Sequence, residues 1–145
     1  MAELDRYFSF MQKQGASDLH LASNSKPMLR LHGNMTPLNV EPLKPEQAEK
    51  ILLEIMPSRN REEFAKCSDT DFAYDLPGVA RFRCNVFRDR HGPGGVFRII
   101  PTKILTAEDL GLPAAVREFC HLPKGLILVT GPTGSGKSTT LCAMI

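Results

Sequence analysis

The residues from Gly131 to Ser138 read Gly-Pro-Thr-Gly-Ser-Gly-Lys-Ser. They fit the pattern G-x-x-x-x-G-K-[ST] without a mismatch. Glycines let the backbone turn its N–H groups inward, while the lysine supplies a cation and the final serine a hydroxyl. This combination predicts a loop that binds the phosphates of a nucleoside triphosphate together with Mg²⁺.

The residues at the end of this loop have separate expected roles. Lys137 is expected to contact the β- and γ-phosphates as a point charge, and Ser138 is expected to give its hydroxyl to Mg²⁺. A helix that begins near Lys137 adds the positive end of its dipole. The predicted nucleotide-binding residues are Gly131, Pro132, Thr133, Gly134, Ser135, Gly136, Lys137, Ser138, Thr139 and Thr140.

A phosphate-binding loop of this kind needs a strand before it and a helix after it. Residues 126–130 (LILVT) form an apolar run without alternation, which is typical of a central parallel strand covered on both faces. Residues 137–145 predict the helix that follows, and a further helix is predicted over 113–121. With no second parallel strand in the sequence, we expect 126–130 to pair with another chain or to be poorly ordered.

The residues before this region show a different organisation. Helical spacing of apolar residues occurs in 3–14 and 45–56, and Ser58 can cap a further helix over 58–66. Strands are predicted over 17–23, 27–33, 71–76, 79–88 and 94–101, with a short third piece at 35–38. Turns are predicted at 77–78 and 91–95, and a linker at 101–111. The pattern predicts an α+β domain with an antiparallel sheet over residues 1–112, and the start of an α/β domain over 113–145.

Five arginines lie close together in the predicted sheet: Arg81, Arg83, Arg88, Arg90 and Arg98. One interpretation is a solvated face of the sheet. The other is a cluster directed at phosphates, since arginine stays charged and binds phosphate oxygens bidentately. Arg81, Arg83 and Arg98 are the candidates for phosphate contact. Nucleic acid is disfavoured as a partner because the net charge is only +2 and no nucleic-acid-binding motif is present.

Several classes of protein and site are disfavoured by composition. The four cysteines, at positions 67, 84, 120 and 142, form no C-x-x-C pair, which favours reduced thiols in a cytoplasmic protein. The N-terminus has no signal-peptide pattern, and no apolar run has the length of a transmembrane segment. The histidines show no metal-ligand spacing, so the only metal expected is Mg²⁺ held through the nucleotide and Ser138.

Five stretches together carry a resemblance to a known family: GASDLHL, PGVARFRCNVF, GVFRIIP, LTAEDLGLP and KGLILVTGPTGSGKSTTLCAMI. In order and spacing they resemble the secretion-ATPase superfamily, and within it the ATPases that retract type IV pili in twitching motility. The resemblance covers essentially the whole chain.

The resemblance implies a PAS-like N-terminal domain followed by the truncated start of a RecA-like P-loop domain. It further implies an ATPase that uses ATP and Mg²⁺, assembles as a homo-hexamer and acts on the inner-membrane platform of the type IV pilus from the cytoplasmic side. In such a protein Lys137 and Ser138 have the loop roles given above. Arg81, Arg83 and Arg98 contact phosphates.

The family's catalytic glutamate, Walker B segment and histidine region have no counterpart in these residues. The resemblance therefore implies that the full-length protein is an Mg²⁺-dependent ATPase. No catalytic residue is expected in this chain, which is expected to be inactive by itself. A pilus-extension or type II secretion ATPase is an alternative. The retraction type is favoured because the other two carry long additional N-terminal domains, whereas GASDLHL begins here at Gly15. A non-catalytic ring-contact module formed by residues 1–112 is another alternative.

Overall fold

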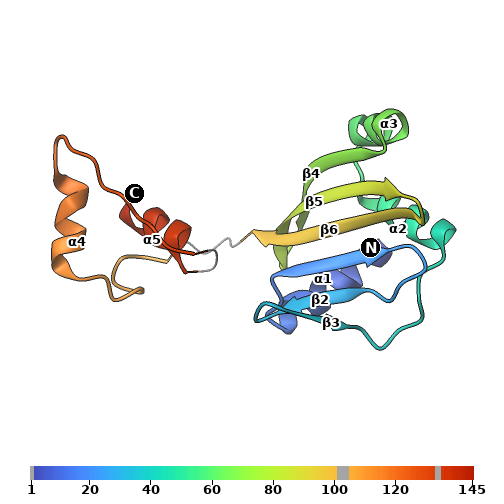
Figure 1. Cartoon of the computed structure of the whole chain (residues 1–145), viewed down its shortest axis with the longest axis horizontal. Coiled ribbons are helices and arrows are strands. Elements are labelled where there is room, and N and C mark those ends of the chain that lie inside the picture. The colour runs from blue at the N-terminus through green and yellow to red at the C-terminus, as the bar shows by residue number, and fades with distance from the viewer. Residues whose placement is uncertain (1, 101–104, 133–134) are drawn as a thin grey trace. The chain divides into compact units, whose positions relative to one another are not determined.

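A six-stranded antiparallel sheet organises the first part of the chain (Figure 1). The computed structural model describes residues 2–100, 105–132 and 135–145. These residues form two compact units, one up to residue 100 and the other from residue 105 onward. The domain boundary predicted between residues 112 and 113 falls inside the second unit and stays a prediction.

The sheet joins strands from both ends of the first unit. Its order is β3-β2-β1-β6-β5-β4, so that β1 lies beside β6 in the middle. Asp18 is paired with Arg98 across this central junction. The strands are β1 (Asp18–Ala22), β2 (Met28–Leu31), β3 (Asn34–Pro37), β4 (Asp69–Leu76), β5 (Ala80–Asp89) and β6 (Gly92–Ile100). The α+β organisation predicted for this part of the chain is confirmed.

Helices α1 (Glu3–Lys13) and α2 (Pro45–Ile55) cover one face of this sheet, and α3 (Ser58–Cys67) lies against β4 (Figure 1). α2 begins on proline, whose fixed φ suits the first helical position. α1 begins where the Asp5 carboxylate accepts the backbone N–H of Ala2 at 2.8 Å. At the start of α1 an N–H group is therefore hydrogen-bonded, and at the start of α2 the proline has no N–H group to satisfy.

The core between helices and sheet is built on aromatic rings. Phe8 of α1 stacks on Phe82, with ring centroids 4.1 Å apart, and meets Phe97 edge-on at 5.3 Å. Gly95 lies under α2, where a Cβ atom would come within 2.8 Å of the Phe97 ring and 3.2 Å of Leu52 Cδ2. The turn predicted at 91–95 is therefore wrong beyond His91, because β6 already begins at Gly92 and its glycines allow close helix packing.

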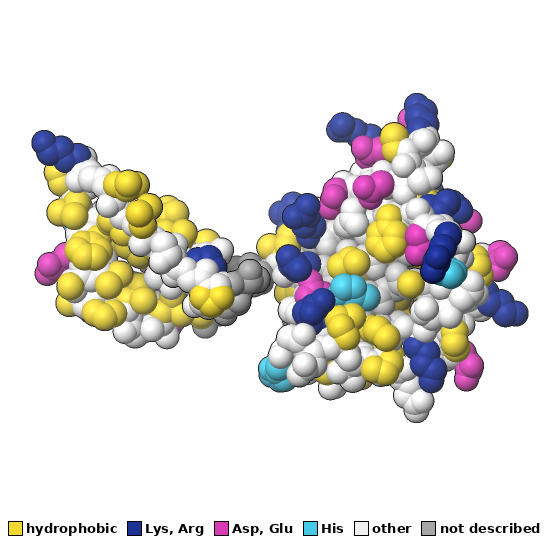
Figure 2. All heavy atoms as spheres, in the orientation of Figure 1, with side chains coloured by type: hydrophobic (Ala, Val, Ile, Leu, Met, Phe, Trp, Pro, Cys, Tyr) yellow, Lys and Arg dark blue, Asp and Glu magenta, His cyan; other side chains and the backbone are white. Residues whose placement is uncertain are grey.

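The other face of the sheet carries none of the helices described in the first unit. Strand alternation places Asp18, Arg83, Asn85, Val96 and Arg98 on it. We call it the open face. Figure 2 shows this face, where basic side chains lie among acidic ones.

The second unit contains α4 (Ala114–Glu118), a 3-10 turn (Phe119–His121) and α5 (Lys137–Met144). The predicted strand over 126–130 is wrong for this chain, because these residues form no strand. Leu126 and Leu128 are 83% and 75% exposed, and Figure 2 shows hydrophobic atoms over the surface of this unit. A parallel strand is held by ladders to its neighbours, and the described residues of this unit provide no other strand.

None of the helices in the described ranges combines the length and apolarity needed to cross a membrane. All four cysteines are free thiols. Cys84 lies in the core, where burial raises the pKa of its thiol to about 12. Residues 2–100, 105–132 and 135–145 contain no group of three His, Cys, Asp or Glu side chains that could hold a metal ion.

Candidate functional site

In the described part of the glycine-rich loop, backbone carbonyl groups lie against the side chain of the loop's own lysine. Gly136, with φ 87°, takes the left-handed conformation just before α5 begins at Lys137. The Lys137 ammonium donates to the carbonyl oxygens of Gly131 at 2.8 Å and Pro132 at 2.7 Å. At Gly131, with φ 151°, a Cβ atom would come within 2.7 Å of the Ser135 hydroxyl oxygen. The Ser135 side chain can turn away, but the positive φ is one that residues with a side chain rarely adopt, so this position favours glycine.

This geometry fits an anion with several oxygens. The ammonium of Lys137 has three N–H donors, of which two are directed at loop carbonyls that an anion would replace. The first N–H groups of α5 have no acceptor within the helix and face the loop end with the positive end of the dipole. Ser138 and Thr139 lie exposed in this first turn, so the Ser138 hydroxyl is accessible as a metal ligand. Two predicted loop residues, Thr133 and Gly134, lie outside the described residues.

A second group of cations lies on the open face of the first unit. Arg83 and Arg98 stand directly opposite each other on β5 and β6. Together with Asp71, Asn85 and Val96 they line a hollow of about 310 Å³. The hollow therefore presents two guanidinium groups, which suit an anionic group, beside the Asp71 carboxylate to which the Asn85 amide already donates.

Carboxylates compensate for the repulsion between these facing arginines. Arg83 Nε lies 3.3 Å from Asp71 Oδ1, and Arg98 Nε lies 2.7 Å from Asp18 Oδ1. Like charges directly opposite each other in a sheet are destabilising, so each arginine needs such a partner. Asp71 is half exposed, and pairs of this kind contribute about 0–1 kcal/mol. The Asp18 side chain is only 3% exposed, so the estimate for exposed pairs does not apply to its pair with Arg98.

Asp18 stays ionised because its hydrogen bonds outweigh its burial. Burial alone would raise the pKa of this carboxyl. The hydrogen bonds from Arg98 and from the Ser17 hydroxyl, together with the charges of Arg98 and Arg30, hold the pKa below its ordinary value. Both oxygens of the buried Asp18 carboxylate are bound, Oδ1 by Arg98 and Oδ2 by Arg30, so the carboxylate holds two arginines in place.

The neighbouring His20 on the open face is held neutral. Burial and the charge of Arg30 lower the pKa of its imidazole, against the weaker opposite influence of Asp18. Its Nε2 atom is buried and finds no hydrogen-bond partner in the described parts of the chain.

The structure divides the five arginines singled out in the sequence. Arg83 and Arg98 share the hollow, and Arg81 lies on the same face, 3.5 Å from Asp75, but does not line it. Arg88 bonds Glu49 of α2 at 2.6 Å and covers the ring of Phe64, so it stabilises the fold. Arg90 bonds only its neighbour His91 in the described structure.

Three residues of the hollow region were not among the predicted site residues: Asp18, Asp71 and Asn85. Asp71 and Asn85 could have been predicted from the short hairpin between β4 and β5, because alternation places them on one face with Arg83. Asp18 is separated from Arg98 by 80 residues, and no local pattern connects the two.

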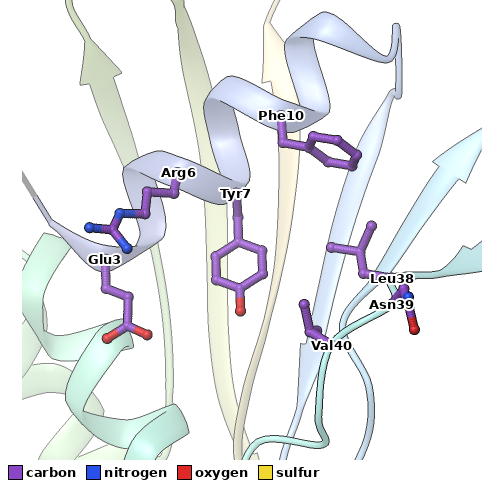
Figure 3. Close-up of a pocket in the computed structure, with 7 residues that line it drawn as sticks. All are labelled: Glu3, Arg6, Tyr7, Phe10, Leu38, Asn39 and Val40. Atoms are coloured by element: carbon purple, nitrogen blue, oxygen red, sulfur yellow. The ribbon is translucent and has the colours of Figure 1, made fainter.

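Another hollow, of about 390 Å³, lies between α1 and residues 38–40 (Figure 3). Tyr7 and Phe10 extend from α1 beside Leu38 and Val40, and Glu3 and Arg6 stand at the start of the helix. Its lining is largely apolar and its one cation stands beside a carboxylate. It therefore lacks the convergent donors that phosphates require.

Comparison with known proteins covers both units. The family model described as Type II/IV secretion system protein matches residues 2–145. The chain is 46% identical, over 143 residues, to the type IV pilus retraction ATPase PilT of Pseudomonas aeruginosa, covering 99% of this chain and 42% of that protein. It is 43% identical to a twitching motility protein of Neisseria gonorrhoeae, covering 82% of this chain and 32% of that protein. The chain thus spans less than half the length of these relatives.

Solved structures agree with this result. The pilus retraction motor PilT with bound ADP matches at a TM-score of 0.79 and 39% identity, covering 97% of this chain and 41% of that one. The Legionella pneumophila ATPase DotB matches at a TM-score of 0.81 and 23% identity, covering 97% of this chain and 40% of that one, which shows the fold alone. These matches confirm the predicted fold class and the resemblance to pilus retraction ATPases. With a family model that matches from residue 2 to residue 145, this chain belongs to the type II/IV secretion system protein family.

Proposed function

We propose that this chain is the N-terminal part of an Mg²⁺-dependent ATPase that powers the retraction of type IV pili and twitching motility. The observation that carries the proposal is the loop in which Lys137 lies against the carbonyls of Gly131 and Pro132 at the start of α5. This arrangement offers a cation and free N–H groups at one point, as triphosphate binding requires.

In this proposal the loop holds ATP and Mg²⁺ through residues with distinct chemistry. Lys137 exchanges its loop carbonyls for the β- and γ-phosphate oxygens, and Ser138 supplies its hydroxyl to Mg²⁺. Thr139 and Thr140 lie near the α-phosphate. Bound Mg²⁺ offsets the negative charge of the phosphates during hydrolysis.

The open face of the first unit contributes further positive charge in the same proposal. Arg83 and Arg98, with Arg81 beside them, contact the phosphates of nucleotide in the assembled protein. The shared hollow supports this role for Arg83 and Arg98 more directly than for Arg81. In the same proposal the assembly is a homo-hexamer that acts on the pilus platform at the cytoplasmic side of the inner membrane; the name of the Pseudomonas aeruginosa relative supports the link to pilus retraction alone.

Retraction is favoured over the related activities by the pattern of identities. The chain is 46% identical to the retraction ATPase of Pseudomonas aeruginosa. It is 32% identical to the type II secretion ATPase of Vibrio cholerae. Deletion of the gene tests the direction of force: hyperpiliated, non-motile cells are expected, whereas bald cells would identify an extension ATPase.

Nucleotide binding is tested by calorimetric titration of full-length protein with Mg²⁺-ATP. Lys137→Ala is expected to weaken binding at least about tenfold, because the anion loses its main cation. Lys124→Ala removes an exposed lysine outside the loop and is the matched control, with affinity within about twofold of the unsubstituted protein. Equal binding by Lys137→Ala and the unsubstituted protein would refute the proposal and leave the ring-contact module as the alternative.

Turnover separates binding from catalysis. The 145-residue chain is expected to hydrolyse no ATP above background, because the acidic residues that organise Mg²⁺ and the attacking water are not among its predicted site residues. A phosphate-release assay on the chain, with full-length protein as the positive control, measures this. Hydrolysis by the chain alone would show that it contains its own catalytic acid.

A further inference from the structure

The arginines of the open face hold their carboxylates through the same atom. Nε is the nitrogen nearest the carboxylate in the pairs Arg81–Asp75, Arg83–Asp71 and Arg98–Asp18. A guanidinium has five N–H donors, of which Nε carries one. A carboxylate bound at Nε therefore orients the side chain while the two terminal nitrogens stay available for another anion.

Asp18 differs from the other two carboxylates in how firmly it is held. Its side chain is 3% exposed, compared with 50% for Asp71 and 70% for Asp75. The Ser17 hydroxyl donates to its Oδ2 at 2.8 Å, and Arg30 Nε lies 3.3 Å from the same oxygen. A carboxylate so enclosed has one orientation, whereas the exposed pairs compete with water.

The two arginines bound to Asp18 differ in their other contacts. Arg30 donates through Nη1 to the carbonyl of Gly33 at 3.2 Å, which ties it to the turn between β2 and β3. Arg98 lines the hollow and faces Arg83 across the strand pair. Without Asp18, repulsion from Arg83 would turn Arg98, which is 66% exposed, away into solvent.

We propose that Asp18 is a positioning residue that fixes Arg98 beside Arg83, so that both direct their terminal guanidinium nitrogens at the phosphates of the nucleotide. Asp18 touches no phosphate itself and acts through Arg98. This inference rests on the proposed function, because the anion that the two arginines meet is the nucleotide proposed above.

A double-mutant cycle on the full-length protein tests this role. The dissociation constant for Mg²⁺-ATP is measured for Asp18→Asn, Arg98→Ala and the double variant. We expect Arg98→Ala to weaken binding about tenfold and Asp18→Asn about three- to tenfold, with the double variant no weaker than Arg98→Ala. A merely structural role for Asp18 would instead make the two effects multiply, and that result would overturn the proposal.

Two further variants keep the test decisive. Arg30→Ala removes the other guanidinium from Asp18 and is expected to leave the ATP affinity within about twofold. Arg98→Lys covers the case in which Asp18→Asn does not fold. It keeps a cation beside Asp18, but an ammonium lacks separate nitrogens fixed toward carboxylate and phosphate. We expect Arg98→Lys to bind ATP nearly as weakly as Arg98→Ala, and unchanged affinity would overturn the proposal.

The failure of this inference is distinguishable from the failure of the proposed function. Suppose that Lys137→Ala weakens ATP binding but Arg98→Ala binds ATP normally, or that the effects of Arg98→Ala and Asp18→Asn multiply. The nucleotide site then stands, and the positioning role of Asp18 is refuted. If Lys137→Ala binds ATP as the unsubstituted protein does, the proposed function itself falls.

Discussion

At the residue scale, the buried carboxylates of the first unit are each held by specific donors. Asp5, 4% exposed, accepts the hydroxyl of Tyr74 and the backbone N–H of Ala2, both at 2.8 Å. Burial and the hydrogen bond to Asp5 raise the pKa of Tyr74 to about 12, so the phenol stays a donor across the physiological range. This contact joins α1 to β4 across 69 residues of sequence.

Tyr74→Phe is therefore expected to lower the free energy of unfolding by about 1–3 kcal/mol, because Asp5 stays buried with one donor fewer. Urea unfolding of the 145-residue chain at neutral pH measures the change. Tyr7→Phe is the matched control. Burial and the charge of Glu3 also raise the pKa of Tyr7, but its hydroxyl makes no hydrogen bond to the described residues. A change below about 0.5 kcal/mol is expected for Tyr7→Phe, and equal losses in both variants would contradict this account.

At the scale of elements, the seating of α2 on the sheet depends on the absence of a side chain at Gly95. A Cβ atom there would meet the buried Phe97 ring at 2.8 Å and Leu52 of α2 at 3.2 Å. Gly95→Ala is expected to destabilise the chain by about 1–3 kcal/mol, because an extra methyl group forces these side chains apart. Thermal and urea unfolding measure the loss.

Leu52→Ala provides the control for this prediction, since it removes the atoms that the new methyl group would meet on α2. We expect the double variant Gly95→Ala/Leu52→Ala to lose less stability than the sum of the single variants. Strict additivity would show that α2 does not pack on Gly95 as the structure describes.

At the scale of the whole molecule, the two units differ in how far their apolar residues are buried. The first unit has an enclosed core, including Phe8, Phe82 and Phe97, whereas Leu126 and Leu128 of the second are mostly exposed. An exposed apolar run of this kind is typical of a segment that is covered in a larger assembly.

Hydrogen exchange measures this difference directly. In the 145-residue chain, the amides of 126–130 are expected to exchange nearly as fast as in an unfolded peptide, because they form no ladder, while those of β5 are protected. In full-length protein the same segment is expected to be protected as a strand. Slow exchange of 126–130 in the short chain would show pairing between copies, and fast exchange in full-length protein would refute the strand prediction altogether.

The sequence predicted the elements that depend on residues close together in the chain, and failed where an element depends on distant neighbours. The helix over Glu3–Lys13 and the strand over Ala80–Asp89 were predicted because their spacing of apolar residues has the period of the element. The strand at 126–130 was predicted from a continuous apolar run without alternation, and it is absent from this chain. Its formation depends on neighbours, and apolar composition does not supply them.

The sequence by itself predicted the loop from Gly131 to Ser138, since its glycines, lysine and hydroxyl lie close together in the chain and depend on local backbone geometry. It also determined which face of each strand carries arginine. Only the tertiary structure decided that β1 lies beside β6, and therefore that Asp18 holds Arg98 next to Arg83. Strand order arises from packing of the whole core, so residues 80 positions apart become partners without any trace in the local sequence.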